Sequence, residues 1–144
     1  MRSAALRAAG IPALVVELNH AVFGALSGDG FAGVWGDITS EEILRAANIG
    51  CARILVLTFP DLSTVQLSVD RARRLNPQVV VVARAALARH VAELRSLGVD
   101  AVVQAEFEGG VEMVRQALVL YSADGPATSR LVADARREFY GETA

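Results

Sequence analysis

The sequence predicts an α/β fold built on a doubly wound parallel sheet. Short apolar strands alternate with helices along most of the chain, which is the pattern of βαβ units and an open parallel sheet. The strands are apolar throughout, and 53% of the 144 residues are hydrophobic. Both properties suit a sheet that is covered on its two faces. A chain of this length forms one ordinary domain with a real core.

Local patterns place the elements of the first half of the chain. A helix over 3–9 ends at Gly10, and Val22 and Leu26 lie one turn apart in the next helix. Thr39 and Glu42 have the spacing of a capping box, which predicts the start of a third helix. The strands that we expect span residues 13–17, 33–36, 53–58, 79–83 and 101–103. The helices between and after them span residues 20–27, 40–47, 60–75, 87–97 and 111–121.

The second half begins with the longest amphipathic helix, 60–75. Its apolar face comprises Leu62, Val65, Val69 and Ala72. Asn76–Pro77 ends it, because proline removes a donor and fixes φ. We divide the chain into a nucleotide-binding domain over 1–121 and a C-terminal segment over 122–144, in which a linker precedes an amphipathic helix at 128–140.

Bulk properties exclude several classes of protein. No apolar stretch reaches the roughly 20 uncharged residues that a membrane helix needs, and the N-terminus lacks the apolar core of a signal peptide. The single cysteine, Cys51, which we expect to be buried, cannot form an intrachain disulfide and indicates a reducing compartment. The net charge of −2 argues against a nucleic acid as partner.

The sequence contains one half of a dinucleotide site, the part that binds the ribose. Glu17 closes an apolar strand, where the carboxylate in a βαβ unit of this kind hydrogen-bonds a ribose hydroxyl. A Gly36–Asp37–Ile38–Thr39 corner follows the next strand. The first strand and the glycine-rich phosphate loop that should precede Glu17 are missing. Since that strand is central in such a sheet, strands 13–17 and 53–58 would keep unpaired edges. We therefore expect further chain upstream of Met1, or a sheet that closes the gap or borrows a partner.

A literal G-x-G-x-x-G at Gly28, Gly30 and Gly33 does not supply the missing loop. The motif works where a strand leads into a helix, because the helix N-terminus holds the pyrophosphate. Here a helix precedes the glycines and a strand with Trp35, which we expect in the core, follows them. The glycines therefore predict a helix end and a tight turn.

Several short motifs in a fixed order carry a family resemblance. They are Val-Val-Glu-Leu-Asn at 15–19, Trp-Gly-Asp-Ile-Thr at 35–39, Ala-Arg-Ile-Leu-Val at 52–56, Leu-Asn-Pro at 75–77, Ala-Arg-Ala at 83–85 and Leu-Gly-Val-Asp at 97–100. Together they resemble the Rossmann-like regulatory domains of potassium transport proteins, called RCK or KTN (TrkA-N) domains. The resemblance is closest to the cytosolic tail of Kef-type potassium/proton antiporters and covers about residues 3–121.

The resemblance implies a site and a function. Glu17 matches the acidic residue that binds the adenosine ribose, and Asn19 stands where the family often has a second carboxylate. Asp37 and Ile38 match the corner that meets the adenine edge, and Thr58 lies at a strand end that lines the cleft. The implied ligand is NAD(H) or AMP. The implied protein is a cytoplasmic, non-enzymatic regulator that acts on a transmembrane antiporter domain, in cis or in trans, and forms a homodimer.

Alternatives remain at the level of the residues. Glu17 fits a solvated strand end, and Asp37 fits a helix-entry residue. The chain could accordingly be an oligomerisation module without a ligand, or a fragment of an NAD-dependent oxidoreductase, although no catalytic or metal-binding constellation accompanies the half-site. Self-association has its own support: Leu131, Ala135 and Phe139 recur at four-residue spacing in the last helix.

Overall fold

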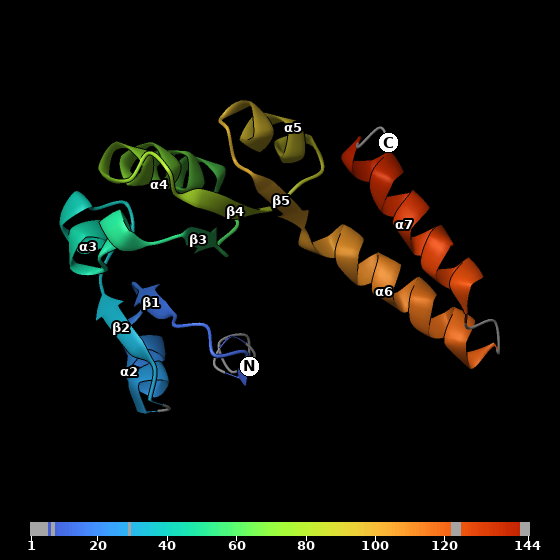
Figure 1. Ribbon diagram of the computed structural model, residues 1–144, viewed down its shortest axis with the longest axis horizontal. Helices are drawn as coiled ribbons and strands as arrows, with labels where there is room; N and C mark the ends of the chain where they lie inside the picture. Colours follow the sequence, from blue (N-terminus) through green and yellow to red (C-terminus); the bar gives the residue numbers. More distant parts are fainter. Residues whose placement is uncertain (1–5, 7, 29, 122–124, 142–144) are drawn as a thin grey trace. The chain divides into compact units, whose positions relative to one another are not determined.

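A computed structural model describes residues 6, 8–28, 30–121 and 125–141. The predicted α/β class with parallel sheets is confirmed (Figure 1). The chain divides into two compact units, Met1–Val56 with Ser63–Val81 and Leu57–Leu62 with Val82–Ala144. No helix among the described residues is long and apolar enough to cross a membrane.

Strands and helices alternate as the sequence predicts. The strands are β1 (Leu14–Glu17), β2 (Ala32–Trp35), β3 (Ile54–Leu57), β4 (Val80–Ala85) and β5 (Ala101–Gln104). The helices are α2 (His20–Gly28), α3 (Glu41–Ala46), α4 (Leu62–Leu75), α5 (Arg89–Ser96), α6 (Ala105–Leu120) and α7 (Pro126–Tyr140), with a short 3-10 turn η1 (Ile49–Cys51). Most of the expected helix at 3–9 and the linker at 122–124 fall outside the described residues.

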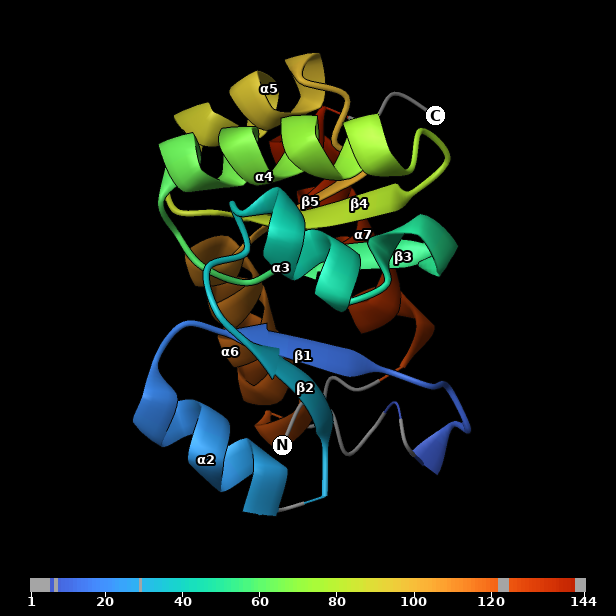
Figure 2. The same ribbon diagram turned by 90° about the vertical axis from the view of Figure 1, so that its left-hand side faces the viewer.

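In the first unit, β1 and β2 form a parallel pair in which Glu17 lies opposite Trp35. Figure 2 shows the two strands side by side with α2 against them. Gly33 allows this packing, because a Cβ on it would lie 2.8 Å from the Phe23 ring and 3.0 Å from the Val15 carbonyl oxygen. Helix α4 then buries Val65, Val69 and Ala72 of the apolar face predicted for it, while Leu62 is half-buried.

The remaining strands form a three-stranded sheet in the order β3-β4-β5, with β4 and β5 parallel. In the part of the chain that the structure describes, no strand precedes Leu14, and β1 and β3 each have a neighbour on one side only.

In the second unit, α7 folds back along α6 (Figure 1). The rings of Phe107 and Phe139 stack at 3.8 Å between centroids. Glu108 accepts two hydrogen bonds from Arg136, at 2.9 and 2.7 Å, and one from the Tyr140 hydroxyl at 3.1 Å. The hydrogen bond to Glu108 raises the pKa of Arg136 above its ordinary value. These contacts fasten the end of α7 to the first turn of α6.

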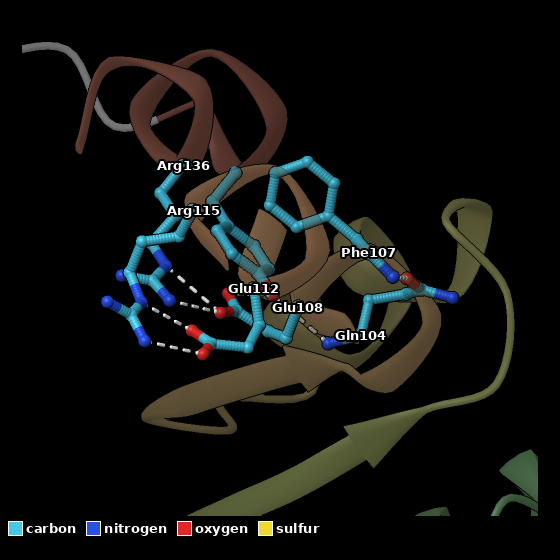
Figure 3. Close-up of polar contacts among 7 residues, drawn as sticks. Gln104, Phe107, Glu108, Glu112, Arg115 and Arg136 are labelled. Carbon is cyan, nitrogen blue, oxygen red and sulfur yellow. Dashed lines mark hydrogen bonds and ion pairs between the residues drawn. The ribbon is translucent and has the colours of Figure 1, made fainter. Parts of the chain in front are cut away.

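A second ion pair lies next to the first on α6. Arg115 donates to both carboxylate oxygens of Glu112, at 2.8 and 2.7 Å. Figure 3 shows the side chains of Arg115 and Arg136 turned toward Glu112 and Glu108. The hydrogen bonds from Arg115 and then from Gln116 lower the pKa of Glu112 to about 2.

Three local predictions were wrong. Thr39 does not cap α3: the N-cap is Ser40, without a side-chain hydrogen bond, because the Thr39 hydroxyl donates to Asp37 instead. Helix α6 begins at Ala105, since the Gln104 side chain accepts from the Phe107 amide and starts the helix before the glycines of its second turn. Cys51 is exposed, because it lies in the surface turn η1.

Candidate functional site

The carboxyl ends of β1 and β2 bring two of the predicted residues together. The amide of Gly36 donates to the carbonyl oxygen of Glu17 at 3.0 Å, which extends the parallel pairing by one step beyond Trp35. Asp37 is therefore one residue beyond the paired segment, at the same edge as Glu17. In open parallel sheets, ligands bind outside this edge.

The residues after Glu17 fold around its carboxylate. The Asn19 amide donates to Glu17 Oε1 at 2.7 Å. The side-chain oxygen of Asn19 accepts from the amides of Ala21 and Val22, at 3.0 and 3.2 Å, and so caps helix α2. Among the described residues, Glu17 Oε2 has no hydrogen-bond partner. That oxygen can accept a hydrogen bond from a ligand, whereas the Asn19 side chain retains only its NH₂ group for one.

The Asp37 carboxylate accepts the hydrogen bonds that hold the Gly36–Thr39 corner together. Asp37 Oδ1 accepts from the amide and the hydroxyl of Thr39, both at 2.8 Å, and its carbonyl oxygen accepts from the Ser40 amide at 2.9 Å. The bonds from Thr39, the amide first, lower the pKa of Asp37 below its usual range. Gly36 has φ +155°, and a Cβ there would lie 2.4 Å from Ile43 Cδ1. The corner therefore requires glycine.

Trp35 supports the loop that follows β1. Its indole Nε1 donates to the Leu18 carbonyl oxygen at 3.0 Å, and the His20 ring meets it edge-on at 5.5 Å. The expectation that Trp35 belongs to the core was wrong, since 54% of it is exposed. It ends β2, so its side chain extends past the last paired residue to the loop. The position of a tryptophan at a strand end was the signal available in the sequence.

Arg71 makes a corresponding contact to the second loop. Its Nη1 donates to the carbonyl oxygen of Thr39. The sequence analysis did not single out Arg71 as part of the site. The available signal was its place on α4 directly before the buried Ala72, where a long polar side chain lies beside the packed face.

The other two predicted residues have different surroundings. Ile38 is half-buried within the turn of the corner. Thr58 directly follows β3 and is exposed, and it belongs to the second unit. The structure thus brings Glu17, Asn19, Asp37 and Ile38 to one edge of the β1–β2 pair.

The rejection of the G-x-G-x-x-G motif is confirmed. Gly28 is the last residue of α2, Gly30 has φ +76° in the turn, and Gly33 lies within β2. Among the described residues the order is helix, turn, strand, so these glycines do not lead into a helix N-terminus.

The comparison with protein families matches residues 3–105 to the TrkA-N domain. This match covers well over half of the chain. The chain belongs to the TrkA-N domain family. The resemblance that the sequence motifs carry is therefore confirmed.

Two relatives have similar sequences over this TrkA-N domain. The putative cation/proton antiporter YbaL of Escherichia coli is 34% identical over 103 residues, which are 72% of this chain and 18% of that protein. The putative K(+) efflux antiporter KefB of Alkalimonas amylolytica is 30% identical over 106 residues, 74% of this chain and 16% of that protein. The chain thus spans less than a fifth of either relative.

Solved structures share the fold. The TrkA-N domain of the Escherichia coli inner membrane protein YbaL has a TM-score of 0.74 at 31% identity, over 80% of this chain and 85% of that one. The Kef CTD of Shewanella denitrificans in its AMP-bound form has a TM-score of 0.69 at 21% identity, over 89% and 93%. The GsuK channel bound to NAD has a TM-score of 0.68 at 22% identity, over 76% and 20%.

Proposed function

We propose that this TrkA-N domain is the ligand-sensing regulatory domain of a monovalent cation (potassium)/proton antiporter or potassium transport system. It binds an adenine nucleotide, NAD(H) or AMP, and does no chemistry on it. The observation that supports this is the juxtaposition of Glu17 and Asp37 at the carboxyl edge of paired parallel strands.

The chemistry of the edge favours the adenosine part of the nucleotide. Glu17 Oε2 accepts from the ribose hydroxyls, a charge-assisted contact worth on the order of 1.5 to 3 kcal/mol. Asp37 is ionised well into mildly acidic solution, because hydrogen bonds from Thr39 lower its pKa. Its carboxylate accepts from the amino group of adenine, and Ile38 offers the base an apolar neighbour. The family resemblance also predicts a ligand contact at Thr58, in the second unit.

The pyrophosphate has no corresponding site among the described residues. The glycines at 28, 30 and 33 follow a helix and precede a strand, so they present no helix N-terminus. NAD should therefore bind this chain little better than AMP, because both rely on the same adenosine contacts. Binding of AMP by the Kef CTD and of NAD by the GsuK channel supports both ligands as candidates.

The relatives support the choice of partner. KefB and YbaL are named as antiporters, and this chain matches less than a fifth of each. The proposed partner is therefore a transmembrane antiporter domain, in cis or in trans, with this domain on the cytoplasmic side of the inner membrane. The division into a nucleotide-binding region, 1–121, and a C-terminal segment, 122–144, belongs to the same proposal.

The domain also pairs with a second copy of itself. Helix α6 has no buried residue, and several apolar side chains along its second half are exposed. Met113 is 75% exposed and Leu120 is 85% exposed, and the residues that follow them, Val114 and Tyr121, are exposed as well. An uncharged stripe of this kind on a helix is the signature of a protein contact. Phe139 does not contribute, because it stacks on Phe107 within the chain.

Titration with AMP tests the nucleotide site. Glu17→Gln keeps the size of the side chain and removes its charge, so affinity should fall about tenfold. Glu93→Gln is the matched control, because Glu93 is an exposed carboxylate on α5. Equal affinities of the Glu17 and Glu93 variants would place the ligand elsewhere. Absence of AMP binding by the wild type would favour a pure oligomerisation module, and turnover of NADH would favour an oxidoreductase.

A further inference from the structure

Helix α4 contacts the Gly36–Thr39 corner, to which the proposed function assigns the adenine base. Arg71 lies in the C-terminal half of α4, 32 residues beyond Thr39 in the sequence, and its guanidinium donates to the Thr39 carbonyl oxygen. The contact joins α4 to the loop after β2, two elements of the first unit. It is part-buried, so water competes for it less than it does for exposed bonds.

Thr39 transmits this contact to the carboxylate. Its carbonyl accepts from Arg71, while its amide and its hydroxyl both donate to Asp37 Oδ1. The three residues form one continuous hydrogen-bonded chain, Arg71 to Thr39 to Asp37. The positive charge of Arg71 also contributes, after the Thr39 bonds, to the lowered pKa of Asp37.

The corner has few other restraints of this kind. Beyond Gly36, whose amide bonds the Glu17 carbonyl oxygen, the bonds of the corner are local and span two or three residues, and Asp37 is exposed. A loop that is closed only by local bonds opens easily. Among the described residues, the bond from Arg71 is a side-chain contact that ties the far end of the corner to a distant element, and so it fixes where the corner points.

We propose that Arg71 is the positioning residue for the adenine half of the site. It touches no ligand and acts through Thr39, which presents the Asp37 carboxylate to the base. This inference rests on the proposed nucleotide function and adds to it a link between the base contact and α4. Binding of adenine at the corner and formation of the bond from Arg71 to Thr39 must then favour one another, since coupling between two sites is reciprocal.

Helix α4 offers a matched control. Arg74 lies on the same helix and pairs with Asp70, one turn earlier, at 2.6 Å, with both side chains largely exposed. Arg74→Gln therefore makes the same change of charge as Arg71→Gln, on the same helix, without touching the corner. Exposed pairs of this type contribute little to stability.

The first test compares two ligands by NMR titration of the whole chain. Ribose 5-phosphate keeps the ribose contact of AMP but lacks the base. Arg71→Gln should weaken AMP about tenfold and leave ribose 5-phosphate unchanged, while Arg74→Gln should bind both ligands as the wild type does. Arg71→Lys, which keeps a donor and the charge, should recover part of the loss. Equal losses for the two ligands, or no loss for AMP, would overturn the proposal.

The second test needs no ligand. In Arg71→Gln the amides of Thr39 and Ser40 should exchange faster with solvent, and the pKa of the Asp37 carboxyl should rise. Unchanged exchange and an unchanged pKa would show that Arg71 does not position the corner. If the wild type fails to bind AMP, the proposed function fails, and these measurements still decide the role of Arg71.

Discussion

The indole of Trp35 donates a hydrogen bond to the carbonyl oxygen of Leu18 at 3.0 Å. The bond runs from the end of β2 to the loop after β1, the loop that carries Asn19. It therefore fixes the first loop of the candidate site, as Arg71 fixes the second. Trp35 is also the single tryptophan of the chain and is half exposed, so its fluorescence reports on this edge alone.

Trp35→Phe should weaken both the loop and the site. The substitution keeps an aromatic ring and removes one hydrogen bond, a loss of about 1 kcal/mol, or roughly fivefold in an affinity that depends on it. Urea denaturation and AMP titration measure the two effects. His20→Ala is the control, because it removes the ring-edge contact and keeps the bond to Leu18. If Trp35→Phe kept the stability and the AMP affinity of the wild type, the bond to Leu18 would not support the site.

The glycines of the G-x-G-x-x-G motif should differ in their tolerance of alanine. A Cβ at Gly33 would meet the Phe23 ring and the Val15 carbonyl oxygen, so Gly33→Ala should cost about 1 to 3 kcal/mol. A Cβ at Gly28 would meet nothing within 4 Å, so Gly28→Ala should be neutral. Urea denaturation gives both values. A phosphate-binding loop would instead lose ligand affinity in both variants without a loss of stability.

Phe139→Ala should release α7 from α6. The variant removes the stacked ring pair, and truncation of this half-buried ring should cost about 2 kcal/mol. Amide exchange along α7 should rise with it. Leu131→Ala on the same helix, where the side chain is 60% exposed, should change neither. Similar exchange in the two variants would mean that the ring stack does not hold the helix.

Acid should weaken the α6–α7 region through Glu112. The pKa of Glu112 is lowered from 4.5 to about 2, so its contribution is present above pH 4.5 and is lost as the pH falls through about 2. Glu112→Gln removes this contribution, so its stability should fall less than that of the wild type between pH 6 and pH 3. Urea denaturation at the two pH values measures the difference, which salt should reduce because the pair is exposed. A parallel fall in both proteins would contradict the assignment.

The exposed stripe of α6 should drive self-association. Sedimentation should show a dimer of the wild type at micromolar concentration. Leu120→Ser should shift the equilibrium toward monomer, because it puts a polar group into the apolar contact. Leu67→Ser, at a partly exposed leucine of α4, is the control and should leave the dimer intact. A wild type that stays monomeric at ten times this concentration would remove the argument.

The sequence predicted the features that depend on strand order. Apolar runs locate strands directly, and parallel strands end at a common edge, so Glu17 and Asp37 could be placed together from their positions alone. The inverted order of helix and strand around Gly28 and Gly33 likewise follows from periodicity. These conclusions need no knowledge of side-chain conformation.

The features that depend on competition between partners could not be predicted. The Thr39 hydroxyl could cap α3 or hydrogen-bond Asp37. It donates to the Asp37 carboxylate, because a charged acceptor makes the stronger bond. Gln104 could end a strand or begin a helix, and it does both: it is the last residue of β5, and its side chain accepts from the Phe107 amide. The contact of Arg71 with Thr39 joins elements that no local pattern relates.

The direct passage from β5 into α6 has a mechanical consequence. Gln104 is the last residue of the strand and the cap of the helix, so no loop separates them. A direct junction leaves few backbone dihedrals in which a rotation of the helix could be absorbed. A rotation of α6 should therefore be passed to β5, and through its parallel pairing to β4, rather than be absorbed in a connecting loop.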